Sequence, residues 1–304
     1  FAPRIVLKIL YQEVLMKRKM VAYISATALL MALLAGCGGT GGQSGPPSTP
    51  PAPVSGEPAQ GEELPTLEHN TDAADAPTVY MTTDISPEGL MAIYEALNWT
   101  PTGSVAVKLS PGEPPNSNYL RPELIKDVVQ AVDGTIVECN TAYGGQRSST
   151  AMHYQVAEDH GFTAIADVVI LDENGSMTIP VSGGTHLSEN YVGEHFADYD
   201  SYLVLSHFKG HAMAGFGGAI KNISIGLGSQ EGKCVIHTGG ASHDSPWGGD
   251  QTAFTESMAE AGKAVSDYLG NGENIVYINV MNRISIDCDC DGNPSKPQMA
   301  DIGI

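Results

Sequence analysis

The segment Tyr202-Leu203-Val204-Leu205-Ser206-His207-Phe208-Lys209-Gly210-His211 contains the strand that decides the fold and the polar residues that follow it. An unbroken apolar run such as 202–205 is typical of a strand buried on both faces, as in a parallel sheet. If the chain stays extended, alternate side chains share one face, so His207, Lys209 and His211 point the same way. Two imidazoles and an amine suit metal binding, anion binding or proton transfer. Hydrogen-bonded structural histidines are the alternative.

Strands and helices alternate on both sides of this segment. Apolar runs predict strands at 78–81, 105–109, 135–139, 167–171 and 274–280, and helical spacing predicts helices at 86–99, 122–132, 149–160 and 252–269. Strands that alternate with helices of this length imply βαβ crossovers. The predicted fold class is therefore α/β, with a mainly parallel sheet and flanking helices, and its sites should lie at the carboxyl ends of the strands.

Two glycine-containing segments are candidate binding loops. Residues 140–147 follow the predicted strand 135–139, and Arg147 offers a planar fork for a carboxylate or a phosphate. In Gly215-Phe216-Gly217-Gly218-Ala219-Ile220-Lys221-Asn222, the glycines can expose backbone N–H groups to an anion beside Lys221. The predicted cofactor-binding residues are Arg147, Gly217, Gly218, Lys221 and Asn222. A solvated loop and a close-packed turn are the respective alternatives.

The segment Asp287-Cys288-Asp289-Cys290-Asp291 is the candidate metal-binding motif. In an extended chain the two cysteines point one way and the carboxylates the other. Paired thiolates are soft ligands for zinc, iron or copper(I), and a local disulfide or buried thiols are the alternatives. Strands of one sheet bring their carboxyl ends to a common edge, so this segment should meet the His207–His211 segment. The predicted metal ligands are His207, His211, Cys288 and Cys290.

The N-terminal part of the chain predicts export. Residues 1–15 are expected to be an upstream extension, and 16–37 resemble a bacterial lipoprotein signal peptide. Its basic start and apolar stretch end in the lipobox Leu-Ala-Gly-Cys, with Cys37 as the lipidated residue. An uncleaved anchor is the alternative. The Gly-, Pro- and Ser-rich residues 38–77 should form a disordered spacer, so the α/β domain, 78–304, would stand outside the cytoplasmic membrane, held by its lipid.

The charge of the chain limits its possible binding partners, and its cysteines leave several disulfide pairings open. The chain carries 15 Lys+Arg against 35 Asp+Glu, a net charge of −20, which argues against nucleic acid and anionic lipid headgroups as partners. After Cys37 there are four further cysteines: Cys139, Cys234, Cys288 and Cys290. In an oxidising compartment they could pair in three ways, and in an anaerobic host they would stay reduced.

These segments, taken in order, resemble the bacterial and archaeal family catalogued as domain of unknown function 362. The resemblance runs from about Val105 to Ile304, and its most specific parts are 206–211 and 215–222. Many members look like ferredoxin fusions with an iron–sulfur insert after the glycine-rich segment. The corresponding stretch here, 232–254, contains only Cys234, so the resemblance implies no iron–sulfur cluster in this chain.

Two further expectations come from this resemblance. The family pattern continues past Ile304, so the domain is expected to be incomplete at its C-terminus. The glycine-rich segment is also distantly similar to one in the nickel-pincer lactate racemase group, where a nearby His and Lys serve cofactor and substrate. That similarity adds weight to His207, His211 and Lys221.

The leading hypothesis for function is a metal- or cofactor-dependent redox or transfer enzyme that acts on a small anionic substrate. A transition metal, zinc or iron, would be its cofactor. Lys209 and His211 are the catalytic candidates, with Lys209 or Lys221 positioning the anion. The alternatives are a non-catalytic lipoprotein that binds a metal or an anion, and a structural envelope protein with disulfides.

Overall fold

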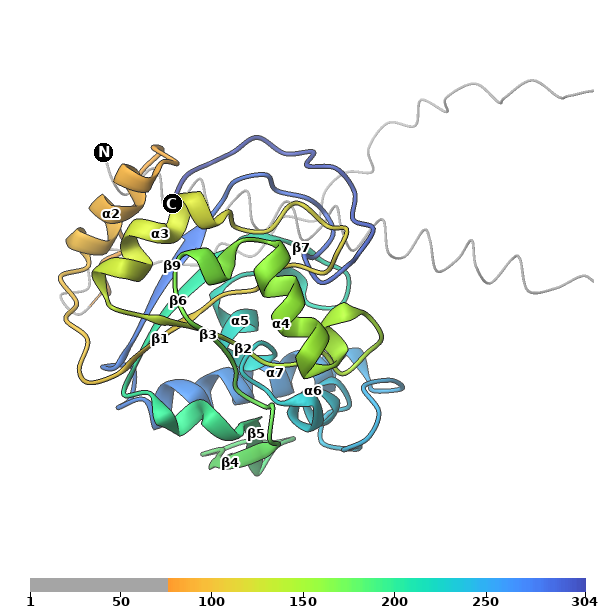
Figure 1. Ribbon diagram of the computed structural model, residues 1–304. Coiled ribbons are helices and arrows are strands. Elements are labelled where there is room, and N and C mark those ends of the chain that lie inside the picture. Colours follow the sequence, from red (N-terminus) through yellow and green to blue (C-terminus); the bar gives the residue numbers. More distant parts are fainter. Residues whose placement is uncertain (1–75) are drawn as a thin grey trace, which may run out of the picture. The chain divides into compact units, whose positions relative to one another are not determined.

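A five-stranded, fully parallel sheet forms the centre of the computed structural model, which describes residues 76–304 (Figure 1). Its order is β3-β2-β1-β6-β9. The strands are β1 (Val105–Lys108), β2 (Thr135–Glu138), β3 (Val168–Ile170), β6 (Ser201–His207) and β9 (Ile275–Val280). The chain builds the sheet outward from β1 to β3 and then returns to the other side of β1. A crevice for a ligand is therefore expected between the carboxyl ends of β1 and β6.

Strand β6 has a neighbouring strand on each side and is covered on both faces. It pairs with β1 from Ser201 to Val204 and with β9 from Tyr202 to His207, and every one of its residues is buried. Leu203 and Leu205 join one hydrophobic cluster, whereas Tyr202 and Val204 join another. The uninterrupted apolar run of this strand is thus explained by a sheet that is covered on both faces.

Helices form both covering layers (Figure 1). On the face of Leu203 lie α2 (Pro87–Ala96), α3 (Pro122–Ala131) and α4 (Thr150–Asp159), and on the face of Tyr202 lie α5 (Ala219–Ser224) and α7 (Gln251–Tyr268). Helix α6 (Gln230–His237) packs against α7. Single-turn 3-10 helices occur at η1 (Gln146–Ser148), η2 (Phe162–Ala164) and η3 (Glu194–Asp198).

Local sequence explains where these helices begin. Ser86 accepts a hydrogen bond from the backbone N–H of Gly89, and Pro87 occupies the first helical position of α2, as the sequence predicted. Asp250 caps α7 in the same way through the N–H groups of Thr252 and Ala253. The predicted α/β class with a parallel sheet and flanking helices is confirmed.

The structure also differs from the sequence prediction. Two antiparallel hairpins were not expected: β4 (Ser176–Pro180) with β5 (Glu189–Gly193), and β7 (Lys209–His211) with β8 (Gly215–Gly217). The strand predicted at 78–81 is wrong, because this exposed segment pairs with no strand within the described residues. Residues 287–291 are not extended either. They form a turn in which Asp291 N–H donates to Cys288 O.

The predictions for the upstream extension, the signal peptide and nearly all of the spacer lie outside the described residues. From residue 76 onward, none of the helices has the length and apolar character needed to span a bilayer.

Candidate functional site

The carboxyl ends of three adjacent strands position the charged side chains of the site. Lys108 is the last residue of β1, Glu138 of β2 and His207 of β6. These strands meet where the sheet order reverses, which is the place that a doubly wound sheet offers to a ligand. The glycine-rich segment and the Cys288–Cys290 turn lie at the same edge.

Lys108 and Glu138 form a buried ion pair at the base of the site. The Lys108 Nζ lies 2.8 Å from Glu138 Oε1, and it also donates to Leu109 O at 2.7 Å and Asn222 Oδ1 at 2.8 Å. All three ammonium hydrogens therefore have acceptors. Burial lowers the pKa of Lys108, and for Glu138 burial is outweighed by Lys108 and further positive charges, which lower its pKa to about 2.

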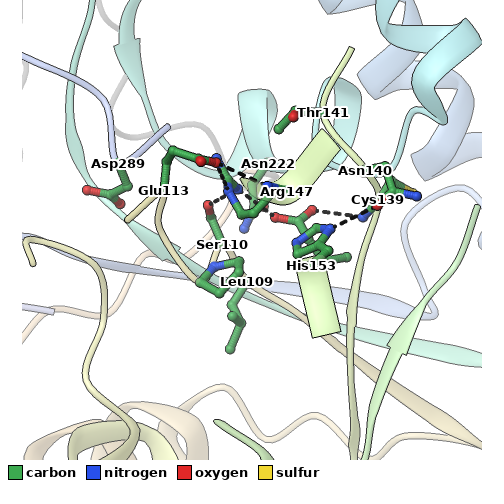
Figure 2. A network of polar contacts seen from close by, with 12 residues as sticks. Leu109, Ser110, Glu113, Cys139, Asn140, Thr141, Arg147, His153, Asn222 and Asp289 are labelled. Atoms are coloured by element: carbon green, nitrogen blue, oxygen red, sulfur yellow. Dashed lines mark hydrogen bonds and ion pairs between the residues drawn. The ribbon is translucent and has the colours of Figure 1, made fainter. Parts of the chain in front are cut away.

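Arg147 contacts Glu138 of this pair and belongs to a network of polar contacts that also contains Glu113 and Ser110 (Figure 2). Its Nε is 3.0 Å from Glu113 Oε2, and its Nη1 is 3.7 Å from Glu138 Oε2 and 3.4 Å from Ser110 Oγ. The third nitrogen, Nη2, is buried and has no partner among the described residues. Gly145 makes room for this arrangement, since its φ is +142° and a Cβ there would lie 2.6 Å from Glu113 Oε1.

His207 and Lys209 converge on Asp289. His207 Nδ1 lies 2.8 Å from Asp289 Oδ2 and its Nε2 lies 2.6 Å from Asn282 O, so both ring nitrogens are engaged. Lys209 Nζ lies 3.2 Å from the same carboxylate. Burial would raise the pKa of Asp289, but Lys209 and His207 hold it well below its usual range. His207 therefore positions the Asp289 loop, and it does not lie with the other predicted metal ligands.

His211, Cys288 and Cys290 form a group that could hold a metal ion. One nitrogen and two sulfurs lie within 4.8 Å of one another. The predicted meeting of the histidine and cysteine segments is confirmed for His211. Gly210 permits it, because its N–H donates to Ser285 O at 2.8 Å and a Cβ there would lie 2.1 Å from Ile286 O.

The ring of His211 is oriented by its own turn. Nδ1 accepts hydrogen bonds from the backbone N–H groups of Met213 and Ala214, at 3.2 and 3.0 Å. Burial, with a smaller effect of Lys221, lowers the pKa of His211 to about 4, so the imidazole is neutral near pH 7. A metal at Nδ1 would replace those two contacts, and a metal at Nε2 would displace the ring proton. The two sulfurs are therefore the firmer part of the ligand set.

The two thiols share a hydrogen bond and one neighbouring cation. The hydrogen bond with Cys290 and burial raise the pKa of Cys288 to about 12, whereas the hydrogen bond from Cys288, with Lys221 and Arg147, lowers that of Cys290 well below its usual value. Lys221 Nζ lies 3.4 Å from Cys288 Sγ. The arrangement favours a thiolate, which is the form that binds a metal.

Two hollows adjoin this group. An inner cavity of about 40 Å³ is lined by Arg147, Lys221, Asn222, Gly218 and the Lys108–Glu138 pair, among others. An outer cleft of about 530 Å³ is lined by His211, Cys288, His237 and Trp247, among others. Tyr143 and Cys290 line both.

The remaining predicted residues have mixed roles. Asn222 is a structural link, since it donates to Leu205 O, Ser206 Oγ and Lys108 O while accepting from Lys108. Gly217 packs near Lys209, where a Cβ would lie 3.2 Å from its Cε. Sequence reasoning missed Lys233 of α6, whose Nζ donates to Gly228 O and Cys139 O, and it missed Lys108 and Glu138. The available signal was a charged residue that ends an otherwise apolar strand, as in Val-Ala-Val-Lys and Thr-Ile-Val-Glu.

The Lys108–Glu138 pair yields a stability prediction. Glu138→Gln leaves a buried ammonium without its counter-charge and should lower the free energy of unfolding by about 3–5 kcal/mol. Lys108→Met should also destabilise the protein. The double variant should lose about 0.5–3 kcal/mol less than the sum of the single losses. Urea unfolding of all four proteins measures this, and additive losses would contradict a direct interaction.

His153 yields a prediction about pH. It is fully buried in α4, its Nε2 has no partner among the described residues, and burial, assisted by Arg147, lowers its pKa from 6.5 to about 3. Below pH 6.5 the unfolded chain takes up a proton that the native state refuses, so stability falls as the pH drops towards 3. His153→Leu should flatten this dependence by at most about 1.4 kcal/mol per pH unit. Urea unfolding from pH 7 to pH 4 tests it, and an unchanged slope would contradict the prediction.

Comparisons with known proteins place the chain in a family. No curated protein matches the sequence. Among solved structures, the lactate racemase apoprotein from Thermoanaerobacterium thermosaccharolyticum is similar with a TM-score of 0.40 and 14% identity, over 67% of this chain and 50% of that one. The chain thus spans half the length of that protein, and so weak a likeness carries no argument about function. The family model described as Domain of unknown function (DUF362) matches residues 105–304, more than half of the chain, and the chain therefore belongs to the DUF362 family.

Proposed function

We propose that this DUF362 protein is a metal-dependent enzyme that carries out a redox or group-transfer reaction on a small anionic substrate. The metal would be held by His211, Cys288 and Cys290, and zinc or iron fits this set of one imidazole and two sulfurs best. Three protein ligands leave a coordination position open for a substrate. The metal would supply a Lewis-acid or electron-transfer centre at that position.

The observation that carries this proposal is the convergence of the three donor atoms within 4.8 Å. They come from β7 and from the turn after β9, two segments that are far apart in the sequence. An imidazole and two thiolates are ligand types that zinc and iron accept, and here they lie beside a cleft. Perturbed thiols at such a place are typical of functional sites.

Positive charge near the metal group supports an anionic substrate. Lys221 contacts Cys288, and Lys209 lies on the same edge of the sheet, in contact with Asp289. Lys209 thus remains a candidate for positioning the anion, and His211 serves as a metal ligand in this proposal. The enclosed hollow beside the metal group favours an enzyme over a protein that only carries a metal.

The disulfide alternative has less support. Cys139, Cys234, Cys288 and Cys290, the cysteines within the described residues, are all free. Cys139 and Cys234 are buried in separate hydrophobic surroundings, and Cys139 Sγ donates to Leu227 O. A structural protein held together by disulfides would not be expected to leave all four of these thiols unpaired.

The location of the protein is part of the proposal. We infer from the lipobox that Cys37 carries a lipid and that the enzyme works outside the cytoplasmic membrane. The membrane would be its partner through this lipid alone, and the acidic chain would not bind nucleic acid. No structural observation bears on these statements, which rest on the sequence pattern.

Metal analysis tests the ligand set. The protein purified without oxygen should retain about one transition-metal ion per chain. Replacing Cys288 and Cys290 together by Ser should abolish tight retention, because the soft donors are lost. Cys234→Ser, which removes a thiol that is not part of the group, is the matched control and should leave the metal content unchanged. Elemental mass spectrometry after gel filtration measures it, and equal metal content in all three proteins would refute the site.

Cell fractionation tests the lipid anchor. Cys37→Ser should move the protein out of the membrane fraction, because only a thiol at this position can accept the lipid before signal cleavage. Continued membrane retention of the variant with an intact N-terminus would show a simple uncleaved anchor instead.

A further inference from the structure

Several positively charged side chains line the inner cavity, and one of their hydrogen-bond donors has no partner among the described residues. Five cationic side chains line it, and Glu138 is the one carboxylate among its lining residues. The cationic residues are Lys108, Arg147, Lys209, Lys221 and Lys233.

Most nitrogens of these cationic groups have hydrogen-bond partners within the described residues, but one does not. Lys108 is satisfied by three acceptors, and Lys209 faces Asp289. Lys221 contacts Cys288 Sγ but no carboxylate among residues 76–304, and Lys233 donates to the carbonyl oxygens of Gly228 and Cys139. Arg147 Nη2 has no partner within the described chain, although Arg147 is only 2% exposed.

Unpaired donors of this kind are costly. A buried N–H without an acceptor costs about 1–3 kcal/mol, because the group gives up its hydrogen bonds to water. An anion bound in the cavity would give Arg147 Nη2 an acceptor, and it would lie beside Lys221, which contacts no carboxylate among residues 76–304. The missing partner is therefore an anion with acceptor oxygens that can reach Arg147 Nη2 and Lys221 Nζ.

The connection to the outer cleft restricts the size and shape of that anion. Cys290 and Tyr143 line both hollows, and the metal-binding group lies on the outer side. A molecule whose acid group lies in the inner cavity can therefore reach the metal group past Cys290. The outer cleft also carries Glu113, Asp287 and Asp291, which repel a second negative charge. Extended polyanions and nucleic acids do not fit this distribution of charge.

From this we propose that the substrate is a small organic acid whose single oxyanion group, a carboxylate or a phosphate, binds in the inner cavity between Arg147 Nη2 and Lys221 Nζ. Its remaining atoms extend towards His211, Cys288 and Cys290. The inner oxyanion site stands on its own contacts, whereas the reacting end of the substrate rests on the proposed metal-dependent function. Arg147 and Lys221 bind the oxyanion group in this proposal. The Lys108–Glu138 pair helps to hold Arg147 in place through Glu138.

Calorimetric titration of the purified full chain tests the oxyanion site. Acetate and inorganic phosphate are the probes, and the ionic strength is held constant with chloride, which also serves as the reference anion. At least one of the two probes should bind saturably at one site. Binding of acetate alone, or of phosphate alone, assigns the head group.

Variants identify the residues. Lys221→Met keeps the length of the side chain and breaks no contact with a carboxylate, so it should fold and should weaken binding by about tenfold or more. Arg147→Lys keeps the charge beside Glu113 but removes Nη2, and it should weaken binding similarly. Lys263→Met removes an exposed lysine of α7 that contacts Asp267, and it should bind like the parent protein. Far-ultraviolet circular dichroism confirms the fold of each variant.

The outcomes separate this inference from the proposed metal chemistry. The double variant Cys288→Ser and Cys290→Ser should still bind the probe, because the oxyanion donors remain. If neither probe binds more tightly than chloride, or if Lys221→Met binds like the parent, the oxyanion site is refuted whatever the metal content. If the probes bind but no metal is retained, the oxyanion site stands and the metal-dependent function falls.

Discussion

The buried ion pair between Lys108 and Glu138 is the interaction on which the rest of the site depends. It joins the ends of β1 and β2, and through Asn222 and Arg147 it also fixes α5 and the loop before α4. A charge in the core of a sheet is tolerated only when every hydrogen finds an acceptor, and Lys108 meets that condition with three. Glu138 also contacts Arg147 and accepts a hydrogen bond from Cys139 N–H, so the pair helps to fix the position of Arg147 as well. The pair thus holds Arg147 and Asn222 in place through direct contacts.

The sheet and its helices could be predicted from the sequence because their signals are local. An apolar run such as β1 followed by an amphipathic helix such as α3 permits few arrangements. The β4–β5 hairpin was missed since its strands are short and mix exposed with buried positions, which gives no clear period. The strand predicted at 78–81 failed for the opposite reason. Its residues have strand propensity, but no partner strand lies beside them in the described part of the chain.

The candidate site was predictable in composition but not in detail. His211, Cys288 and Cys290 meet as expected. The alternation of side chains along one strand does not explain why they meet. The chain leaves β6 at Phe208 and turns into β7, so His207 stays with Asp289 while His211 reaches the sulfurs. The cysteines converge through a turn, not through extended backbone. Lys108 and Glu138 were read as parts of strands, because periodicity reports burial and does not report which buried groups are charged.

The origin of the metal group in two separate segments has a thermodynamic consequence. An unfolded chain can offer the neighbouring thiols of Cys288 and Cys290 to a metal, but it cannot hold His211 beside them. Metal would therefore bind the native chain more tightly than the unfolded one, and the difference would appear as added stability that grows with the logarithm of free metal concentration. The abundance of this protein in a cell would then follow the metal supply of its compartment, since metal-poor chains would open more often and be degraded sooner.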